Sequence, residues 1–156
     1  MDNAASQTPA GDCRLDRFYQ LYTDLGPGSS KATLNNTLAK VYHNDVTFVD
    51  PMHRVQGLSD MERYFSGLYE NITSISFAFH RALEDGNHST VHWTMSYRHP
   101  QLYGGKKEIN VEGVSLLTWQ DDHIIRHQDI FDAGGLLYEH LPVLGWIIRK
   151  LKERMA

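Results

Sequence analysis

Two aspartates and one histidine are the residues of this sequence best suited to acid–base chemistry. Asp50 ends a short apolar run, Val46 to Asp50, and is followed at once by Pro51. Asp129 and His127 lie two residues apart in another run, a spacing that puts both side chains on one face of a strand. A carboxylate among apolar neighbours loses hydration, which suits it to act as a general acid or base. We therefore take Asp50, Asp129 and His127 as the candidate catalytic residues.

Each of the three also has a purely structural interpretation. Asp50 precedes a proline at a strand end, where a carboxylate often accepts only from the amides of the turn. Asp129 could accept a buried hydrogen bond from a histidine or a tryptophan. His127 could pack in the core or orient Asp129. The two interpretations differ in whether both carboxylates face one accessible cavity.

The spacing of apolar side chains predicts the elements that would hold these residues. Helical spacing predicts helices over 15–25 and around 34–42. A short strand is expected over 46–50, and Ser59 with Glu62 forms a capping box that opens a third helix. Beyond this helix the period changes to two, which predicts antiparallel strands at 75–83, 90–99, 109–119 and 124–131.

These elements predict a soluble α+β domain in which a cone-shaped, curved, mixed or antiparallel sheet wraps around the N-terminal helices. Such a sheet must be covered on one face, and the curvature leaves a cavity under it. We expect a flexible tail over 1–12, the domain over 13–133 and a helical extension over 134–156. The extension, a helix from Leu136 to about Arg154, would pack on the domain, lid the pocket or join a dimer.

Strand parity sorts the side chains that would face the cavity. The predicted substrate-binding residues are Phe18, Tyr22, Phe48, Trp93, Met95, Tyr97, Ser115, Leu117, Trp119 and Phe131. The opposite face is mixed, with Glu112, Leu116, Arg126 and Ile130 among its members. A mixed face suits either solvent or a homodimer interface, and we expect a homodimer through it.

Composition and missing motifs exclude several classes of protein. The chain has 156 residues with 15 Lys and Arg against 19 Asp and Glu, a balance that argues against nucleic-acid binding. His123 and His127 would lie about 13 Å apart on a strand, too far to share a metal ion. The glycine pairs lack the context of a phosphate-binding loop, so we expect neither a metal nor a cofactor.

The cysteine content and the absence of recognisable targeting segments predict the cellular compartment. Cys13 is the only cysteine, which rules out an intrachain disulfide. No signal peptide and no apolar stretch long enough to cross a bilayer is recognisable, so we expect a cytoplasmic protein without a membrane partner.

Two segments resemble a known family. The run from Tyr42 to Pro51, followed by Gly57 and the Met61 to Phe65 segment, resembles the nuclear transport factor 2-like superfamily. The ending Ile125 to Asp132 is similar to its SnoaL-like polyketide cyclase branch. The resemblance covers roughly Leu15 to Leu144 and implies a cone of curved sheet and helices that is usually dimeric. Members are isomerases, cyclases, dehydratases, epoxide hydrolases and non-catalytic binders.

The resemblance also bears on individual residues. Asp50 matches the proton-abstracting acid of the related ketosteroid isomerases, and Asp129 lies near the strand-borne acid of the polyketide cyclases. Phe18 and Ser115 stand where the steroid enzymes carry their oxyanion donors, so steroid isomerase activity is not expected. We expect a cofactor-free isomerase, lyase or cyclase acting on a small apolar carbonyl compound. The alternative is a non-catalytic module that binds an apolar ligand or a protein.

Overall fold

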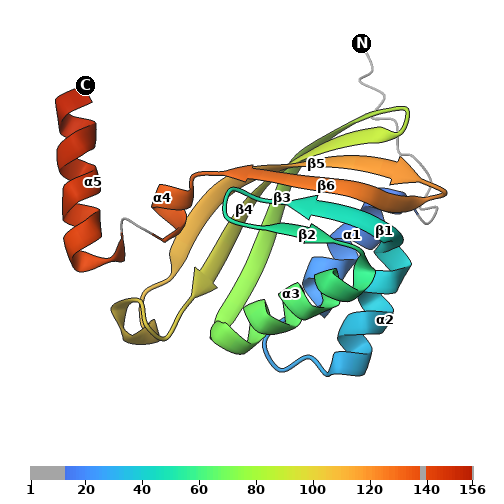
Figure 1. The fold of residues 1–156 in the computed structure, drawn as a ribbon, viewed down its shortest axis with the longest axis horizontal. Coiled ribbons are helices and arrows are strands. Elements are labelled where there is room, and N and C mark those ends of the chain that lie inside the picture. Colours follow the sequence, from blue (N-terminus) through green and yellow to red (C-terminus); the bar gives the residue numbers. More distant parts are fainter. Residues whose placement is uncertain (1–12, 138–139, 156) are drawn as a thin grey trace, which may run out of the picture.

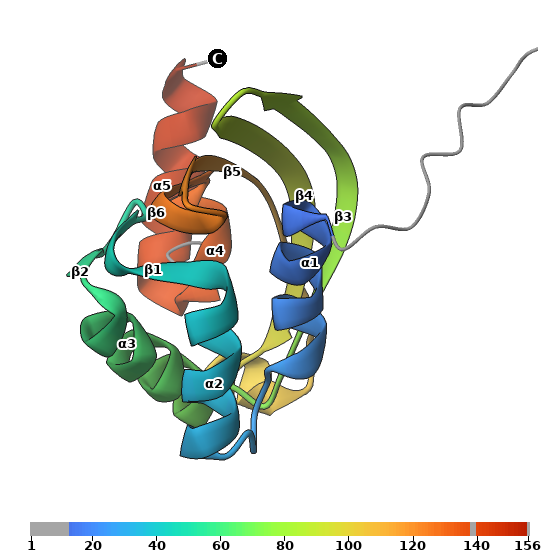
Figure 2. The same ribbon diagram turned by 90° about the vertical axis from the view of Figure 1, so that its right-hand side faces the viewer.

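A curved six-stranded sheet with helices on its concave side makes up most of the structure (Figures 1 and 2). The computed structural model describes residues 13–137 and 140–155. Its elements are α1 (Arg14–Asp24), α2 (Lys31–Val41), β1 (Tyr42–Val49), β2 (Arg54–Gln56), α3 (Leu58–Asn71), β3 (Ser74–Asp85), β4 (His88–Arg98), the 3-10 turn η1 (Tyr103–Gly105), β5 (Ile109–Gln120), β6 (His123–Phe131), α4 (Ala133–Leu136) and α5 (Pro142–Met155). The predicted α+β fold is confirmed, whereas the predicted tail over 1–12 lies outside the described residues.

The order of the strands brings the ends of β1 and β6 together. The sheet runs β2-β1-β6-β5-β4-β3, with β1 parallel to β6 and all other neighbours antiparallel. Val49 pairs with Gln128 across the parallel strands. Asp50, which follows Val49, is thereby carried to the part of β6 that holds Asp129. The predicted meander of four strands is β3 to β6.

The sheet is larger than the sequence pattern predicted. β1 begins at Tyr42 instead of Val46, and its register against β6 shifts between Tyr42 and Thr47. The polar residues 43–45 break the apolar alternation there, so this part of the strand gave no signal. β2 was missed because three residues are too few to show a period.

Three helices cover the concave face with one apolar side each. The buried residues are Leu15, Phe18 and Leu21 of α1, Leu34, Leu38 and Val41 of α2, and Met61, Phe65 and Tyr69 of α3. The predicted capping box was wrong, because α3 begins before Ser59 with Gly57 as its N-cap. Gly57 has φ 84°, which glycine adopts without a steric penalty, and its N–H donates to the Val46 carbonyl at 2.6 Å.

The C-terminal segment is two helices, not one. α4 ends at Leu136, and α5 begins at Pro142, a residue whose fixed φ suits the first turn of a helix. α5 projects away from the sheet and from α1 to α3 (Figure 1). Val143, Trp146, Ile147 and Leu151 of α5 are exposed. No helix in residues 13–137 or 140–155 is long and apolar enough to cross a membrane.

One glycine lets β4 and β5 pack closely on the concave face. A Cβ atom on Gly113 would lie 2.2 Å from the Trp93 ring, far inside van der Waals contact. The ring cannot easily move away, because its Nε1 donates to the Ser115 hydroxyl at 2.9 Å. Gly113 is therefore required by the position of Trp93.

We predict that Gly113→Ala lowers the free energy of unfolding by about 1–3 kcal/mol, because the added methyl displaces the Trp93 ring. Urea denaturation followed by circular dichroism measures this change. Gly67→Ala is the matched control, since nothing lies within 4 Å of a Cβ there and α3 gains helix propensity. A Gly113→Ala protein as stable as the wild type would contradict the observed packing of Trp93.

Candidate active site

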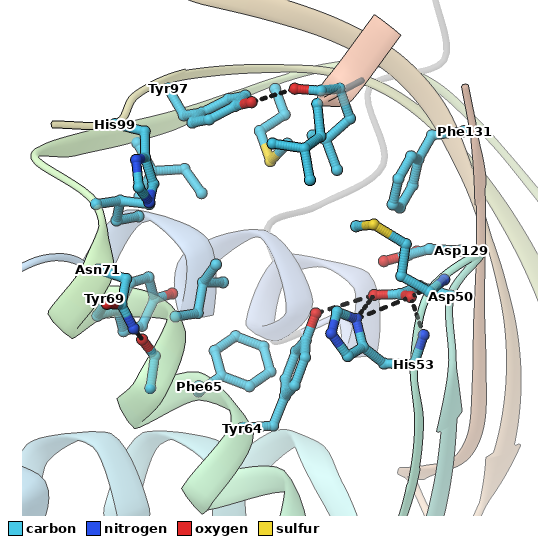
Figure 3. A pocket seen from close by; sticks show the side chains of 18 of the residues that line it. Asp50, His53, Tyr64, Phe65, Tyr69, Asn71, Tyr97, His99, Asp129 and Phe131 are labelled. Atoms are coloured by element: carbon cyan, nitrogen blue, oxygen red, sulfur yellow. Dashed lines mark hydrogen bonds and ion pairs between the residues drawn. The ribbon is translucent and has the colours of Figure 1, made fainter. Parts of the chain in front are cut away.

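A pocket of about 560 Å³ lies between the concave face of the sheet, α3 and the segment at α4 (Figure 3). Its wall is largely apolar, and Leu136 and Leu137 contribute to it from the C-terminal side. Eight of the residues predicted from the sequence line it: Asp50, Asp129, Tyr22, Phe48, Trp93, Met95, Tyr97 and Phe131. Both candidate carboxylates therefore face one cavity.

Asp50 is fixed by the turn after β1 and by α3. Its Oδ1 accepts from the backbone N–H groups of Met52 at 2.7 Å and His53 at 2.6 Å. The Tyr64 hydroxyl donates to Oδ2 at 2.9 Å, and the His53 ring Nδ1 lies 3.2 Å from both oxygens. Asp50 thus lines the pocket as strand parity predicted, and it also performs the structural task of holding the turn.

Asp129 is held on one oxygen only. Its Oδ1 accepts from the Ser115 hydroxyl at 2.5 Å and from Nε2 of His127 at 2.7 Å. Its Oδ2 makes no hydrogen bond with any of the residues that the structure describes. The carboxylate lies at the same end of the pocket as Asp50 and His53 (Figure 3). Asp129 therefore combines a fixed orientation with a free oxygen.

His127 stands behind Asp129 in the core. Its side chain is fully buried, and its Nδ1 lies 2.9 Å from the hydroxyl of Tyr42, itself 1 % exposed. Because the Tyr42 hydroxyl can donate to Nδ1, we assign the ring proton to Nε2, which then donates to Asp129. Phe18 and Phe48 contact the ring edge to face. His127 therefore positions Asp129 instead of lining the pocket.

Five predicted site residues lie behind the pocket wall: Phe18, Ser115, Leu117, Trp119 and His127. Strand parity placed Ser115, Leu117, Trp119 and His127 on the concave face, but α1, which carries Phe18, covers part of that face. Trp119, for example, lies under Arg14 of α1 and donates to the hydroxyl of Ser89 at 2.8 Å. Ser115 is enclosed between Trp93 and Asp129, where it acts as a link between their side chains.

Six polar residues of the pocket were not predicted as site residues: His53, Arg63, Tyr64, Tyr69, Asn71 and His99. Tyr64 follows Met61 at the helical spacing of the buried side of α3, where an apolar residue is expected. A tyrosine on the buried side of a helix needs a hydrogen-bond partner for its hydroxyl. This requirement could have indicated that a polar group lies close to Tyr64. His53 and His99 lie in turns after strands, where no periodic pattern indicates the direction of a side chain.

The pocket tyrosines stay protonated at neutral pH. Burial, followed by the negative charge of Asp50, raises the pKa of Tyr64 well above its ordinary value. Burial alone raises the pKa of Tyr97 to about 12. Both hydroxyls therefore remain hydrogen-bond donors in the range where a carboxylate can accept a proton.

No group of three His, Cys, Asp or Glu side chains within residues 13–137 and 140–155 is arranged to hold a metal ion. The chemistry that the described residues can themselves supply is proton transfer and hydrogen bonding.

Comparisons with known proteins place this geometry in a family. No curated protein matches the chain. A protein from Catenulispora acidiphila DSM 44928 with a ketosteroid isomerase-like fold, solved with trimethylamine, is 16% identical with a TM-score of 0.68, over 90% of this chain and 98% of that one. A candidate SnoaL-like polyketide cyclase from Jannaschia sp. CCS1 is 14% identical with a TM-score of 0.66, over 84% and 93% of the two chains.

An LEH-like epoxide hydrolase from M. tuberculosis also shares the fold, with 13% identity, a TM-score of 0.62 and coverage of 88% and 93%. The model of the SnoaL-like domain family matches residues 30–127, more than half of the 156 residues. The chain therefore belongs to the SnoaL-like domain family.

Proposed function

We propose that this SnoaL-like protein is a cofactor-independent acid–base enzyme, an isomerase, lyase or cyclase, that acts on a small apolar carbonyl compound. One observation carries the proposal: Asp129 presents a free oxygen to a largely apolar pocket while Ser115 and His127 hold its other oxygen. A base must be fixed near the proton it removes, and it must keep a lone pair for that proton. Asp129 meets both requirements.

The base in this proposal is Asp129, although Asp50 matched the family position better. Both oxygens of Asp50 already accept hydrogen bonds, from two turn amides and from Tyr64. If Asp50 gave up these hydrogen bonds to act as the base, the turn after β1 would lose the contacts that hold it. Asp50 is therefore assigned to hold the Tyr64 hydroxyl and the His53 ring at the reacting end of the pocket.

The reaction would begin with transfer of a proton from the carbon next to the carbonyl group to Oδ2 of Asp129. The electron pair of the broken C–H bond moves to the carbonyl oxygen and gives an enolate. The Tyr64 hydroxyl lies at the same end of the pocket, and it would turn its one proton from Oδ2 of Asp50 to the enolate oxygen as the negative charge forms there. Return of the proton to another carbon completes an isomerisation. In a cyclisation the enolate carbon attacks a second carbonyl group, and the alkoxide formed takes the proton back from Asp129.

Steroid isomerase activity is not part of the proposal. Phe18 has no donor and contacts His127 in the core, and Ser115 already donates to Asp129. Neither residue can supply the oxyanion contact that the steroid enzymes have at these positions.

A non-catalytic ligand-binding protein is the second candidate function. Asp50 favours it, because its hydrogen bonds to Met52 and His53 are those of a turn-forming residue. In that case Asp129 would serve only to satisfy His127 and Ser115. The two functions differ in whether a bound ketone exchanges its protons.

We expect the protein to accelerate exchange of the α-protons of 2-tetralone or carvone with D₂O, followed by NMR. Asp129→Asn should lower the rate at least 100-fold, because the amide cannot accept the proton. Asp50→Asn should lower it less, and its melting temperature shows how much of the loss reflects a weakened turn.

Binding of these ketones without exchange would support the non-catalytic function instead. Exchange that depends on Asp50 and survives in Asp129→Asn would show that the wrong carboxylate has been assigned as the base.

His127 should act as a positioning residue. His127→Leu removes the donor to Asp129 and should lower kcat at least 10-fold while the KM for the ketone stays nearly constant. His127→Gln places an amide N–H near the position of Nε2 and should restore much of the rate. Equal losses in the two variants, or a loss that appears in KM, would contradict the positioning role.

We further propose that the protein forms a homodimer through the outer face of the sheet. Leu116 and Ile130 are 38% and 50% exposed on neighbouring strands there, and Leu83 lies on the same face. Exposed apolar side chains grouped in this way are typical of interfaces. A cytoplasmic location stays a prediction.

Sedimentation velocity should show a dimer that Ile130→Lys converts to a monomer, because a buried lysine would lack a partner. Leu151→Lys on α5 serves as the comparison, since α5 carries a second exposed apolar face. Dissociation by Leu151→Lys alone would place the interface on α5, and a monomeric wild type would contradict dimer formation.

A further inference from the structure

The pocket has a second polar region, away from the carboxylates. Tyr69, Asn71 and His99 lie at the opposite end from Asp50 and Asp129 (Figure 3). The wall between the two ends is mainly aromatic and aliphatic, with Phe65 and Leu68 of α3 among its residues. A ligand that fills the pocket therefore meets polar groups at both of its ends.

Among the residues at this end, Tyr69 gives the strongest indication that a ligand binds there. Four tyrosines line the pocket. Tyr64 donates to Asp50, Tyr97 donates to the Leu136 carbonyl, and Tyr22 shares a hydrogen bond with Tyr42. The hydroxyl of Tyr69 alone has no hydrogen-bond partner in the part of the chain that the structure describes.

This free hydroxyl belongs to a buried residue, since Tyr69 is only 7% exposed. Among the described side chains, the one sealed polar atom without a partner is Oδ1 of Asn35. The Tyr69 hydroxyl is therefore not sealed in the protein interior, and Tyr69 is one of the residues that line the pocket. A buried hydroxyl open only to a cavity is satisfied by what fills the cavity.

His99 adds a donor to this end. Its Nδ1 accepts from the backbone N–H of Gln101 at 3.1 Å, so in the neutral ring the proton lies on Nε2. Asn71 donates from Nδ2 to the Gly67 carbonyl at 2.6 Å, which leaves its amide oxygen as an acceptor. Arg63, the cation on the pocket wall, pairs with Asp60 at 3.2 Å and is largely exposed.

We infer that the pocket selects an elongated hydroxy-ketone, with its carbonyl group at the Asp129 end and its hydroxyl group bound by Tyr69 and His99. A hydroxyl both donates and accepts, which matches a tyrosine hydroxyl and a ring N–H at the same end of the pocket. The apolar wall between the ends matches a ring system that separates the two oxygens. The inference rests on the proposed function for the carbonyl end, and it makes Tyr69 a specificity-determining residue.

Two matched pairs of probes test the inference by isothermal titration calorimetry. The pairs are 1-tetralone with 6-hydroxy-1-tetralone and 4-acetylbiphenyl with 4-acetyl-4′-hydroxybiphenyl, which place the hydroxyl group at two distances from the carbonyl. In at least one pair, the hydroxylated compound should bind wild-type protein about 3- to 10-fold more tightly, the effect of one hydrogen bond. Tyr69→Phe should abolish this preference and leave the affinity for the parent ketone unchanged.

Tyr19→Phe is the matched control, since Tyr19 lies outside the pocket wall and the same hydroxyl is removed. It should keep the full preference. Equal binding within both pairs, a preference that survives in Tyr69→Phe, or no binding of any probe would overturn the inference. A preference that depends on Tyr69, in a protein that exchanges no α-protons, would uphold this subsite and reject the acid–base function. Exchange of α-protons, in a protein that shows no preference for the hydroxylated compounds, would support the acid–base function and reject this subsite.

Discussion

A buried chain of hydrogen bonds from Tyr42 through His127 to Asp129 connects the core of this protein to its pocket. The bond between Tyr42 and His127 is buried and the bond between His127 and Asp129 is partly buried, so a lost partner is costly and each group constrains the next. The chain links β1 to β6, and the parallel pairing of those strands also brings Asp50 to the pocket. Ser115 and Trp93 extend the same network into β5 and β4. The orientation of the Asp129 carboxylate thus depends on four strands of the sheet, β1, β4, β5 and β6.

The fold and the inward direction of both aspartates could be predicted from the sequence. Long apolar runs such as Val91 to Tyr97 show their period clearly, and parity then fixes the direction of every second side chain. The helix over residues 15–25 is equally plain. These signals are local. The structure agrees with them because every second side chain of a strand is buried on the concave face, and burial favours apolar residues at those positions.

The composition of the pocket wall could not be predicted in the same way. Parity cannot show where α1 lies on the sheet, and Arg14 of α1 covers Trp119, which is buried instead of facing the cavity. The tyrosines of α3 were similarly ambiguous. Tyr64 and Tyr69 occupy positions where phenylalanine would serve a core equally well. Only the three-dimensional arrangement separates the Tyr64 hydroxyl, which holds Asp50, from the Tyr69 hydroxyl, which has no partner among the described residues. The turn that carries His53 is held by the Asp50 carboxylate. The sequence therefore contained no separate pattern that would have predicted the position of His53.

The wall formed by Leu136 and Leu137 has a consequence for regulation. These residues close one side of the pocket, and Tyr97 donates to the Leu136 carbonyl from inside it. The same stretch of chain leads toward α5, whose apolar residues are exposed. A partner bound to α5 would act on this wall through His140, whose Nε2 lies 2.8 Å from the Gly135 carbonyl, and a ligand bound against the wall would act on α5 by the same route. Occupancy of the pocket and association through α5 would then be coupled equilibria, in which each changes the other by the same factor.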